Sequence, residues 1–294
     1  MTSVHTPVLL DEVLEWLRIK AEGTYIDATL GAGGHAEAIA ARLTTGRLIS
    51  LDRDAQALEL ARERLKIFEK RVTLVHAPFS KIAEAARELG IPAVDGVLAD
   101  LGVSSMHLDQ AARGFSFREA GPLDMRMDEG EELTAGEIVN RWPEKELANL
   151  LYREADEHDS RKIARAIVRA RPIRDTAHLA TVVAGARKQW GRQRLHPATK
   201  TFLALRIAVN REMEELGQFL SRVPATMNSG ARCVILTYHS GEDRLVKEAF
   251  REAARHGTLK ILTKHVVRPS EEEERMNPRS RSAKLRCAER VSAA

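Results

Sequence analysis

The glycine-rich turn at residues 31–34 is the feature that most constrains how this chain folds. It lies between an apolar run at 24–26, which ends at Asp27, and a helical pattern at 36–43. Glycine allows close approach of the backbone to a ligand, and the first N–H groups of a helix are free to donate to it. A second apolar run ends at Asp52, where a carboxylate suits hydrogen bonding to ribose hydroxyls. The pattern predicts a cofactor site, in preference to a tight turn that binds nothing.

The turn by itself does not identify the cofactor. Residues 31–36 satisfy the pattern G-x-G-x-x-A of dinucleotide-binding enzymes, so a nicotinamide-dependent oxidoreductase remains open. Enzymes that use S-adenosylmethionine share the strand, turn and helix and also place an acid after the second strand. The rest of the chain has to distinguish the two.

Four apolar runs, each followed by a helical pattern, occupy the first hundred residues: 24–26, 47–51, 72–76 and 94–99. This alternation predicts an α/β fold with a doubly wound, parallel, Rossmann-like sheet. Ligands bind beyond the carboxyl ends of such strands, so Asp27, Asp52, Phe79 and Asp100 should converge. Phe79 is placed either to stack on an adenine ring or only to seal the core, and both interpretations stay open.

The alternation stops near residue 105, the stretch from about 105 to 205 is mostly helical or irregular in pattern, and the alternation resumes after Asn210. We therefore expect a helical domain at 105–205, inserted into an α/β domain formed by 1–104 and 206–294. A strong strand follows at 233–237, and extended stretches at 259–267 and 283–291 close the chain, with an exposed loop at 268–282 between them. With no helix between them, these two stretches should pair antiparallel. A parallel sheet finished by an antiparallel strand is typical of S-adenosylmethionine methyltransferases and unlike the repeated halves of a nicotinamide-binding domain.

Charge is strongly segregated within the insert, although the net charge of the whole chain is only +4. Residues 104–160 hold 14 acidic and 6 basic residues, whereas 161–211 hold 13 lysines and arginines and one acid. Arg161, Arg165 and Arg169 form a row at helical spacing. This excess is more than solubility requires and predicts a polyanionic partner, RNA or DNA.

The composition excludes several other classes of protein. The two cysteines, Cys233 and Cys287, lack metal-ligand spacing, so we expect buried thiols and no metal. No apolar stretch approaches the length of a membrane span, and the N-terminus has no signal-peptide pattern. We expect a soluble, cytoplasmic protein.

Several motifs together carry a resemblance to one family. They stand in order along nearly the whole chain, at residues 5–12, 27–35, 52–54, 78–80, 100–105, 113–117, 121–128, 196–199, 206–210, 239–240, 242–244 and 277–282. With these motifs the chain resembles the RsmH (MraW) family of bacterial methyltransferases. Members of that family modify N4 of a decoding-centre cytosine in 16S ribosomal RNA.

The resemblance implies a cofactor, S-adenosyl-L-methionine, and a substrate, the small ribosomal subunit or its 16S RNA. The residues that it and the glycine pattern assign to the cofactor are Gly31, Gly33, Gly34, His35, Asp52, Phe79 and Asp100. His107 stands where many relatives have glutamine, and we retain it because imidazole also donates or accepts a hydrogen bond. Tyr238 and Gly241 also differ from the commoner residues beside the His239-Ser240 pair.

For the chemistry, Asp100 is our candidate to orient, or accept from, the cytosine amino group, with capping of a backbone N–H as the alternative. His239 and Ser240 follow the fifth predicted strand and are candidates to touch the base. Lys200, Arg206 and the arginine row are candidates for phosphate contacts. Asp124 and Arg126 are expected to pair or to meet substrate. A methyltransferase acting on DNA or another RNA, and an RNA-binding factor without catalysis, remain alternatives.

Overall fold

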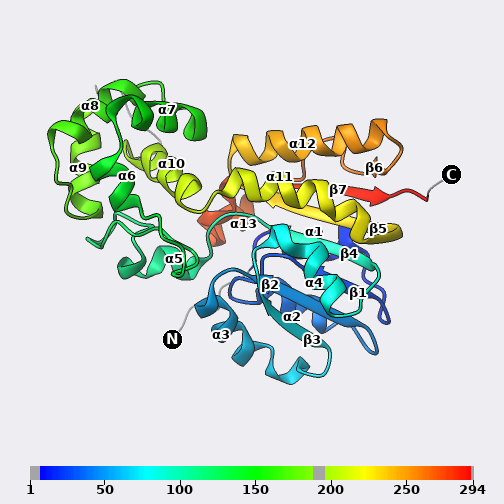
Figure 1. The fold of residues 1–294 in the computed structure, drawn as a ribbon. Helices are drawn as coiled ribbons and strands as arrows, with labels where there is room; N and C mark the ends of the chain where they lie inside the picture. The colour runs from blue at the N-terminus through cyan, green and yellow to red at the C-terminus, as the bar shows by residue number, and fades with distance from the viewer. Residues whose placement is uncertain (1–6, 188–195, 293–294) are drawn as a thin grey trace. The chain divides into compact units, whose positions relative to one another are not determined.

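The computed structural model describes residues 7–187 and 196–292 (Figure 1), so His5 and Thr6 of the first motif lie outside the described residues. The chain divides into two compact units, Met1–Gly102 with Met213–Ala294, and Val103–Glu212. The domain boundary expected at 205/206 falls inside helix α10 (Thr199–Val209), which continues the second unit. Residues before and after position 205 in α10 are buried in the second unit. The second unit therefore includes the whole of α10 and ends at Glu212.

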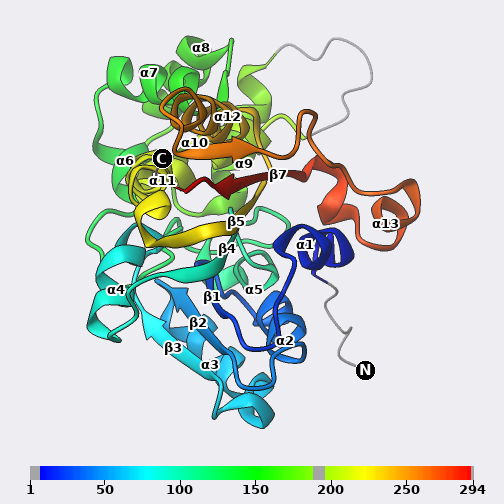
Figure 2. The ribbon, with the colours of Figure 1, turned by 90° about the vertical axis from the view of Figure 1, so that its right-hand side faces the viewer.

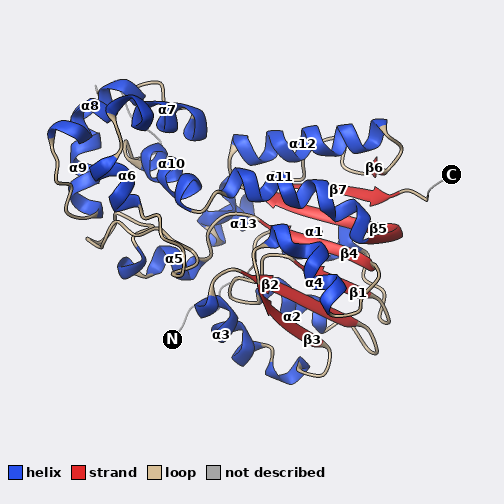
Figure 3. Ribbon diagram, viewed as in Figure 1, coloured by secondary structure: helices blue, strands red, loops and turns tan. Residues whose placement is uncertain are grey.

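The first unit is built on a seven-stranded sheet with the order β3-β2-β1-β4-β5-β7-β6 (Figure 3). Its strands are β1 (Thr24–Asp27), β2 (Arg47–Asp52), β3 (Val72–His76), β4 (Val94–Asp100), β5 (Met227–Thr237), β6 (Leu259–Ile261) and β7 (Lys284–Arg290). Strands β1 to β5 pair in parallel, and β7 is antiparallel to both β5 and β6. The predicted parallel sheet and its antiparallel finish are confirmed.

Helices cover both faces of this sheet (Figure 2). They are α1 (Leu10–Leu17), α2 (Gly34–Ala40), α3 (Ala55–Arg64), α4 (Ile82–Glu88), α11 (Glu212–Arg222) and α12 (Ser240–Arg255), whereas α13 (Glu271–Met276) has no buried residue. One buried cluster joins the sheet to α1, α2 and α3, and another joins it to α4, α11 and α12. The central strands are apolar along nearly their whole length because both of their faces are buried.

The C-terminal segment differs from our prediction in two respects. The expected strand at 259–267 is only three residues long, and the expected loop contains α13. The Ser270 side chain accepts from the backbone N–H of Glu273, which caps α13 at its N-terminus. Four glutamates occupy its first turn, where the helix dipole favours negative charge. Capping and charge form this helix without apolar periodicity, which explains why the pattern missed it.

Within its described residues, 103–187 and 196–212, the second unit consists of helices and irregular segments and contains no strand. Its helices are α5 (Ser105–Asp109), α6 (Ala135–Arg141), α7 (Glu144–Ala155), α8 (Ser160–Arg169), α9 (Thr176–Ala186) and α10. They enclose a hydrophobic cluster of their own. The Asn210 side chain accepts from the N–H of Met127 at 2.8 Å and donates to the carbonyls of Met125 at 2.8 Å and Arg206 at 2.9 Å. These bonds tie the irregular segment before α6 to the end of α10.

Across the part of the chain that the structure describes, no helix combines the length and the apolar character needed to cross a lipid bilayer.

Candidate cofactor and substrate site

The glycine turn after β1 is held closed by Asp52 at the end of β2. The Gly31 N–H donates to Asp52 Oδ2 at 2.8 Å, and the Asp54 N–H donates to Asp52 Oδ1 at 2.9 Å. Each oxygen of Asp52 thus accepts one backbone N–H. The carboxylate that we predicted for ribose binding therefore also shapes the turn.

Gly33 and Gly34 stand where neighbouring atoms leave too little room for a side chain. Gly33 has a φ of +80°, and a Cβ added there would lie 3.2 Å from the Cβ of Ala61. A Cβ on Gly34 would lie 2.6 Å from Pro7 Cγ. The left-handed backbone at Gly33 and the close approach at Gly34 therefore both require glycine. His35 follows them into α2, where it is buried and its Nε2 lies 3.0 Å from the Val8 carbonyl.

Asp100 ends β4 and is contacted from three sides. Its backbone N–H donates to Thr29 Oγ1 at 2.6 Å. Its Oδ1 accepts from the Tyr238 hydroxyl at 2.7 Å, and its Oδ2 lies 3.6 Å from His35 Nδ1. The Asp100 side chain is 25% exposed. The structure thus brings Asp100, His35 and Tyr238 together, and our reading of the sequence gave no role to Tyr238.

Asp27, at the tip of β1, is almost fully buried. Its Oδ1 accepts from the Thr29 N–H at 3.2 Å, whereas its Oδ2 has no hydrogen-bond partner among the described residues. Burial raises the pKa of Asp27 to about 7, and the negative charges of Asp100 and Asp52 add to the rise against the opposing Thr29 bond. A carboxyl group that is desolvated beside two like charges is a candidate for a functional site.

Phe79 begins a short 3-10 helix, η2 (Phe79–Lys81), that follows β3. Its ring packs edge-to-face on Phe219, with 5.6 Å between the centroids, and against the buried cluster on that side of the sheet. It therefore does seal the core, and it remains partly exposed beyond the end of β3. A second role in adenine stacking stays a prediction.

His107 belongs to the second unit and caps α5. Its Nδ1 lies 3.2 Å from both the backbone nitrogen and the hydroxyl of Ser104, and its ring packs on Phe115 at 4.7 Å. It is buried, so the structure gives the imidazole a local role in holding the start of α5. Its predicted contact with the cofactor stays a prediction.

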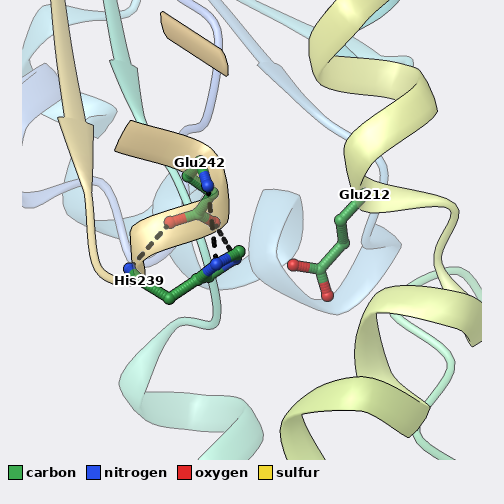
Figure 4. A group of neighbouring side chains, drawn as sticks. All are labelled: Glu212, His239 and Glu242. Atoms are coloured by element: carbon green, nitrogen blue, oxygen red, sulfur yellow. Dashed lines mark hydrogen bonds and ion pairs between the residues drawn. The ribbon is translucent and has the colours of Figure 1, made fainter. Parts of the chain in front are cut away.

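His239 and Ser240 begin helix α12 after β5. His239 is the N-cap residue: its Nδ1 accepts from the Glu242 N–H at 3.4 Å, and Glu242 Oε2 accepts in return from the His239 N–H at 3.3 Å (Figure 4). Glu242 Oε2 also accepts from the Tyr238 N–H at 2.8 Å. This capping box fixes how the chain leaves β5. A direct role of His239 and Ser240 toward the base stays a prediction.

The basic face predicted in the insert has mixed support from the geometry. Arg161, Arg165 and Arg169 are all exposed on α8, opposite its buried apolar side. Arg165 lies 3.4 Å from Glu144, and the Lys200 ammonium donates to the Asp156 carbonyl at 2.7 Å. All four cations thus remain at or near the surface of the second unit.

Arg206 requires a correction. It forms a bidentate pair with Glu212, both bonds at 2.7 Å, and its side chain is only 14% exposed. The guanidinium is taken up by the turn after α10 and is not displayed for a phosphate. Asp124 and Arg126 do pair, at 2.7 and 2.8 Å, so the ion pair expected within the insert is confirmed.

A parallel sheet in which antiparallel β7 lies between β5 and β6 is the fold of the class I S-adenosylmethionine-dependent methyltransferases. Comparison with known proteins identifies the family to which the chain belongs within this class. The family model described as "MraW methylase family" matches residues 2–291. The chain belongs to this family.

Two curated relatives share about half of their residues with the chain. Ribosomal RNA small subunit methyltransferase H of Koribacter versatilis is 50% identical, over 97% of this chain and 94% of the relative. The protein of the same name from Solibacter usitatus is 49% identical, over 97% of this chain and 99% of the relative. The similarity thus extends over both units of the chain.

Proposed function

We propose that this protein transfers the methyl group of S-adenosyl-L-methionine to N4 of a decoding-centre cytosine in 16S ribosomal RNA. One observation carries the proposal: relatives named ribosomal RNA small subunit methyltransferase H are about 50% identical over nearly the full length of both proteins. The choice of cytosine N4 comes from the motifs shared with the RsmH family.

The residues around the glycine turn fit the cofactor. Asp27 presents a buried oxygen without a partner among the described residues, and the turn that follows it carries two glycines at positive φ, Gly31 and Gly33. The cofactor would lie against the backbone of Gly31, Gly33 and Gly34, and the Asp52 carboxylate would accept from its ribose hydroxyls. Phe79 would pack on the adenine. When bound, S-adenosylmethionine supplies a methyl group already activated on a sulfonium sulfur.

Asp100 is the group that we assign to the amino substrate. The amino nitrogen of cytosine is a weak nucleophile because its lone pair is delocalised into the ring. A carboxylate that accepts from the N4 hydrogens orients the group and stabilises the positive charge that it gains. His35 lies beside the Asp100 carboxylate, and the Thr29 hydroxyl accepts from its backbone N–H. The target base has to leave its stack to reach such a site.

The second unit supplies the contacts to the RNA backbone. The exposed row of Arg161, Arg165 and Arg169 suits phosphates, and Lys200 adds a fourth cation. Contacts of this kind position the RNA with little sequence choice and make binding dependent on salt. The small ribosomal subunit, which presents folded RNA, is the partner that we propose.

Methyl transfer from labelled S-adenosylmethionine tests this proposal directly. The substrates are small subunits and naked 16S RNA from cells that lack this protein, with duplex and single-stranded DNA as controls. We expect label in N4-methylcytidine after digestion to nucleosides. Label in another nucleoside would refute the assignment of the atom, and label in DNA would favour the alternative substrate. Absorbance and fluorescence titration with NADH tests the oxidoreductase alternative, for which we expect no response.

A further inference from the structure

Tyr238 lies at the exit of β5, directly beside the tip of β4. In the sheet Asp100 pairs with Leu236, and the Leu101 N–H donates to the Leu236 carbonyl at 3.1 Å. Tyr238 therefore emerges next to Asp100, and its hydroxyl donates to Asp100 Oδ1 at 2.7 Å. A short bond from a neutral donor to a carboxylate is among the stronger hydrogen bonds in proteins.

The phenol of Tyr238 is held in this position from several sides. Its backbone N–H donates to Glu242 Oε2 in the capping box of α12, which fixes its main chain. The ring packs against the buried cluster of the sheet, and its Cδ2 lies 3.5 Å from where a Cβ on Gly102 would stand. The hydroxyl is therefore aimed at Asp100 by the fold itself.

The environment also keeps the hydroxyl protonated. Burial raises the pKa of Tyr238 well above its usual range, and the Asp100 carboxylate raises it further. Tyr238 is thus the donor and Asp100 Oδ1 the acceptor of this bond. On the other oxygen, His35 Nδ1 approaches at 3.6 Å. The two neighbours thus lie on different oxygens of the Asp100 carboxylate.

We propose that Tyr238 is a positioning residue that holds the Asp100 carboxylate ionised and oriented toward the amino group of the substrate. The inference rests on the proposed function for the step at Asp100. A donor to the charged form of a carboxyl group lowers its pKa, so Tyr238 keeps Asp100 able to accept at pH values where an unassisted aspartate begins to protonate. Tyr238 is also one of the positions at which this chain departs from the commoner residue of the RsmH family.

Tyr238→Phe tests this because it removes the hydroxyl and retains the ring. A hydrogen bond of about 1.5 kcal/mol to a charged group corresponds to a shift of about one pH unit. We expect the acidic limb of the single-turnover methyl-transfer rate to move up by about one unit. The rate then falls about tenfold on that limb and stays near wild type on the plateau.

A titration of the Asp100 carboxyl carbon by NMR, with aspartate labelled by carbon-13 and the signal assigned by Asp100→Asn, is the readout that does not depend on activity. We expect the Asp100 midpoint to rise by about one unit in Tyr238→Phe. Tyr25→Phe is the matched control, because it removes another tyrosine hydroxyl of the same unit, one that accepts from the Lys20 N–H. We expect Tyr25→Phe to lower stability and to leave both profiles unchanged.

The outcomes are distinct. An Asp100 midpoint and an acidic limb that stay at their wild-type values in Tyr238→Phe would overturn the proposal. A shifted midpoint in a protein that methylates no RNA would leave Tyr238 as the group that holds Asp100 ionised and would refute the proposed function instead. If Tyr238→Phe does not fold, the same two measurements are made on protein with 3-fluorotyrosine at position 238. Its more acidic hydroxyl donates more strongly, so the midpoint and the limb should move to lower pH, and no movement would again overturn the proposal.

Discussion

Asp27→Asn should change how the stability of this protein depends on pH. In the folded protein the pKa of Asp27 is raised to about 7 by burial and by the neighbouring carboxylates, from 3.8 in an unperturbed chain. Between these two values the folded state holds a proton that the unfolded state has released. The contribution of Asp27 to stability is therefore fully present below about pH 4 and is lost as pH rises through about 7. Asparagine retains the bond from the Thr29 N–H and cannot ionise.

The magnitude follows from the shift. A difference of one bound proton is worth about 1.4 kcal/mol for each pH unit, and about two such units lie between pH 5 and the folded midpoint. Wild type should therefore lose about 3 kcal/mol of unfolding free energy relative to Asp27→Asn between pH 5 and pH 9. Any cost of fitting the amide into the site is the same at every pH and cancels in this comparison.

Urea unfolding followed by circular dichroism at pH 5, 6, 7, 8 and 9 measures the difference. Asp11→Asn, at an exposed position on α1, is the control and should run parallel to wild type. A constant gap between wild type and Asp27→Asn over this range would refute the reasoning, because it would mean that the buried carboxyl is ionised throughout. A gap that widens toward low pH in favour of the variant would have the wrong sign and refute it equally.

Three further predictions concern other parts of the molecule. Replacing Arg161, Arg165 and Arg169 by glutamate should weaken RNA binding and reduce the slope of log K against log salt concentration by about three. The affinity for S-adenosylmethionine, measured by calorimetry, should stay at the wild-type value, and an equal loss of both affinities would indicate misfolding. Gly33→Ala should lower the unfolding free energy by about 1–2 kcal/mol, since its φ is +80°, and an unchanged urea midpoint would contradict this. Asn210→Ala removes three hydrogen bonds within the second unit and should cost about 2–3 kcal/mol in thermal or urea unfolding; a loss confined to the first unit would argue against it.

Much of the sheet could be predicted because buried parallel strands have a simple signature. Strands such as β2 and β4 are covered on both faces and read as continuous apolar runs, and each is followed by a helix. The alternation of apolar runs with helical patterns then gives the order of strands and helices along the chain. Helix α13 lacked any such signature, because four successive glutamates carry no apolar periodicity and its start depends on the Ser270 side chain. A helix formed by a cap and by charge is visible only in three dimensions.

The site was predictable where it depends on the backbone and less so where it depends on side-chain direction. Parallel strands place Asp27, Asp52 and Asp100 at one edge whatever their rotamers. The bond from Tyr238 to Asp100 joins residues 138 positions apart and depends on where a ring packs. Arg206 illustrates the converse error: its charge suggested phosphate, but the turn after α10 brings Glu212 onto both of its donors.

The three carboxyl groups at the strand tips bear on the kind of cofactor that the site favours. Burial, and after it the negative charges of Asp100 and Asp52, raise the pKa of Asp27 to about 7, so the Asp27 carboxyl keeps its proton at pH values where an ordinary aspartate is ionised. A pyrophosphate brought to the same edge would add two negative charges to it. S-adenosylmethionine brings a sulfonium and an ammonium against one carboxylate, a net positive charge, and so offsets the negative charges of this edge instead. The electrostatics of this edge therefore favour the methyl donor over a dinucleotide, although the glycine pattern accommodates both.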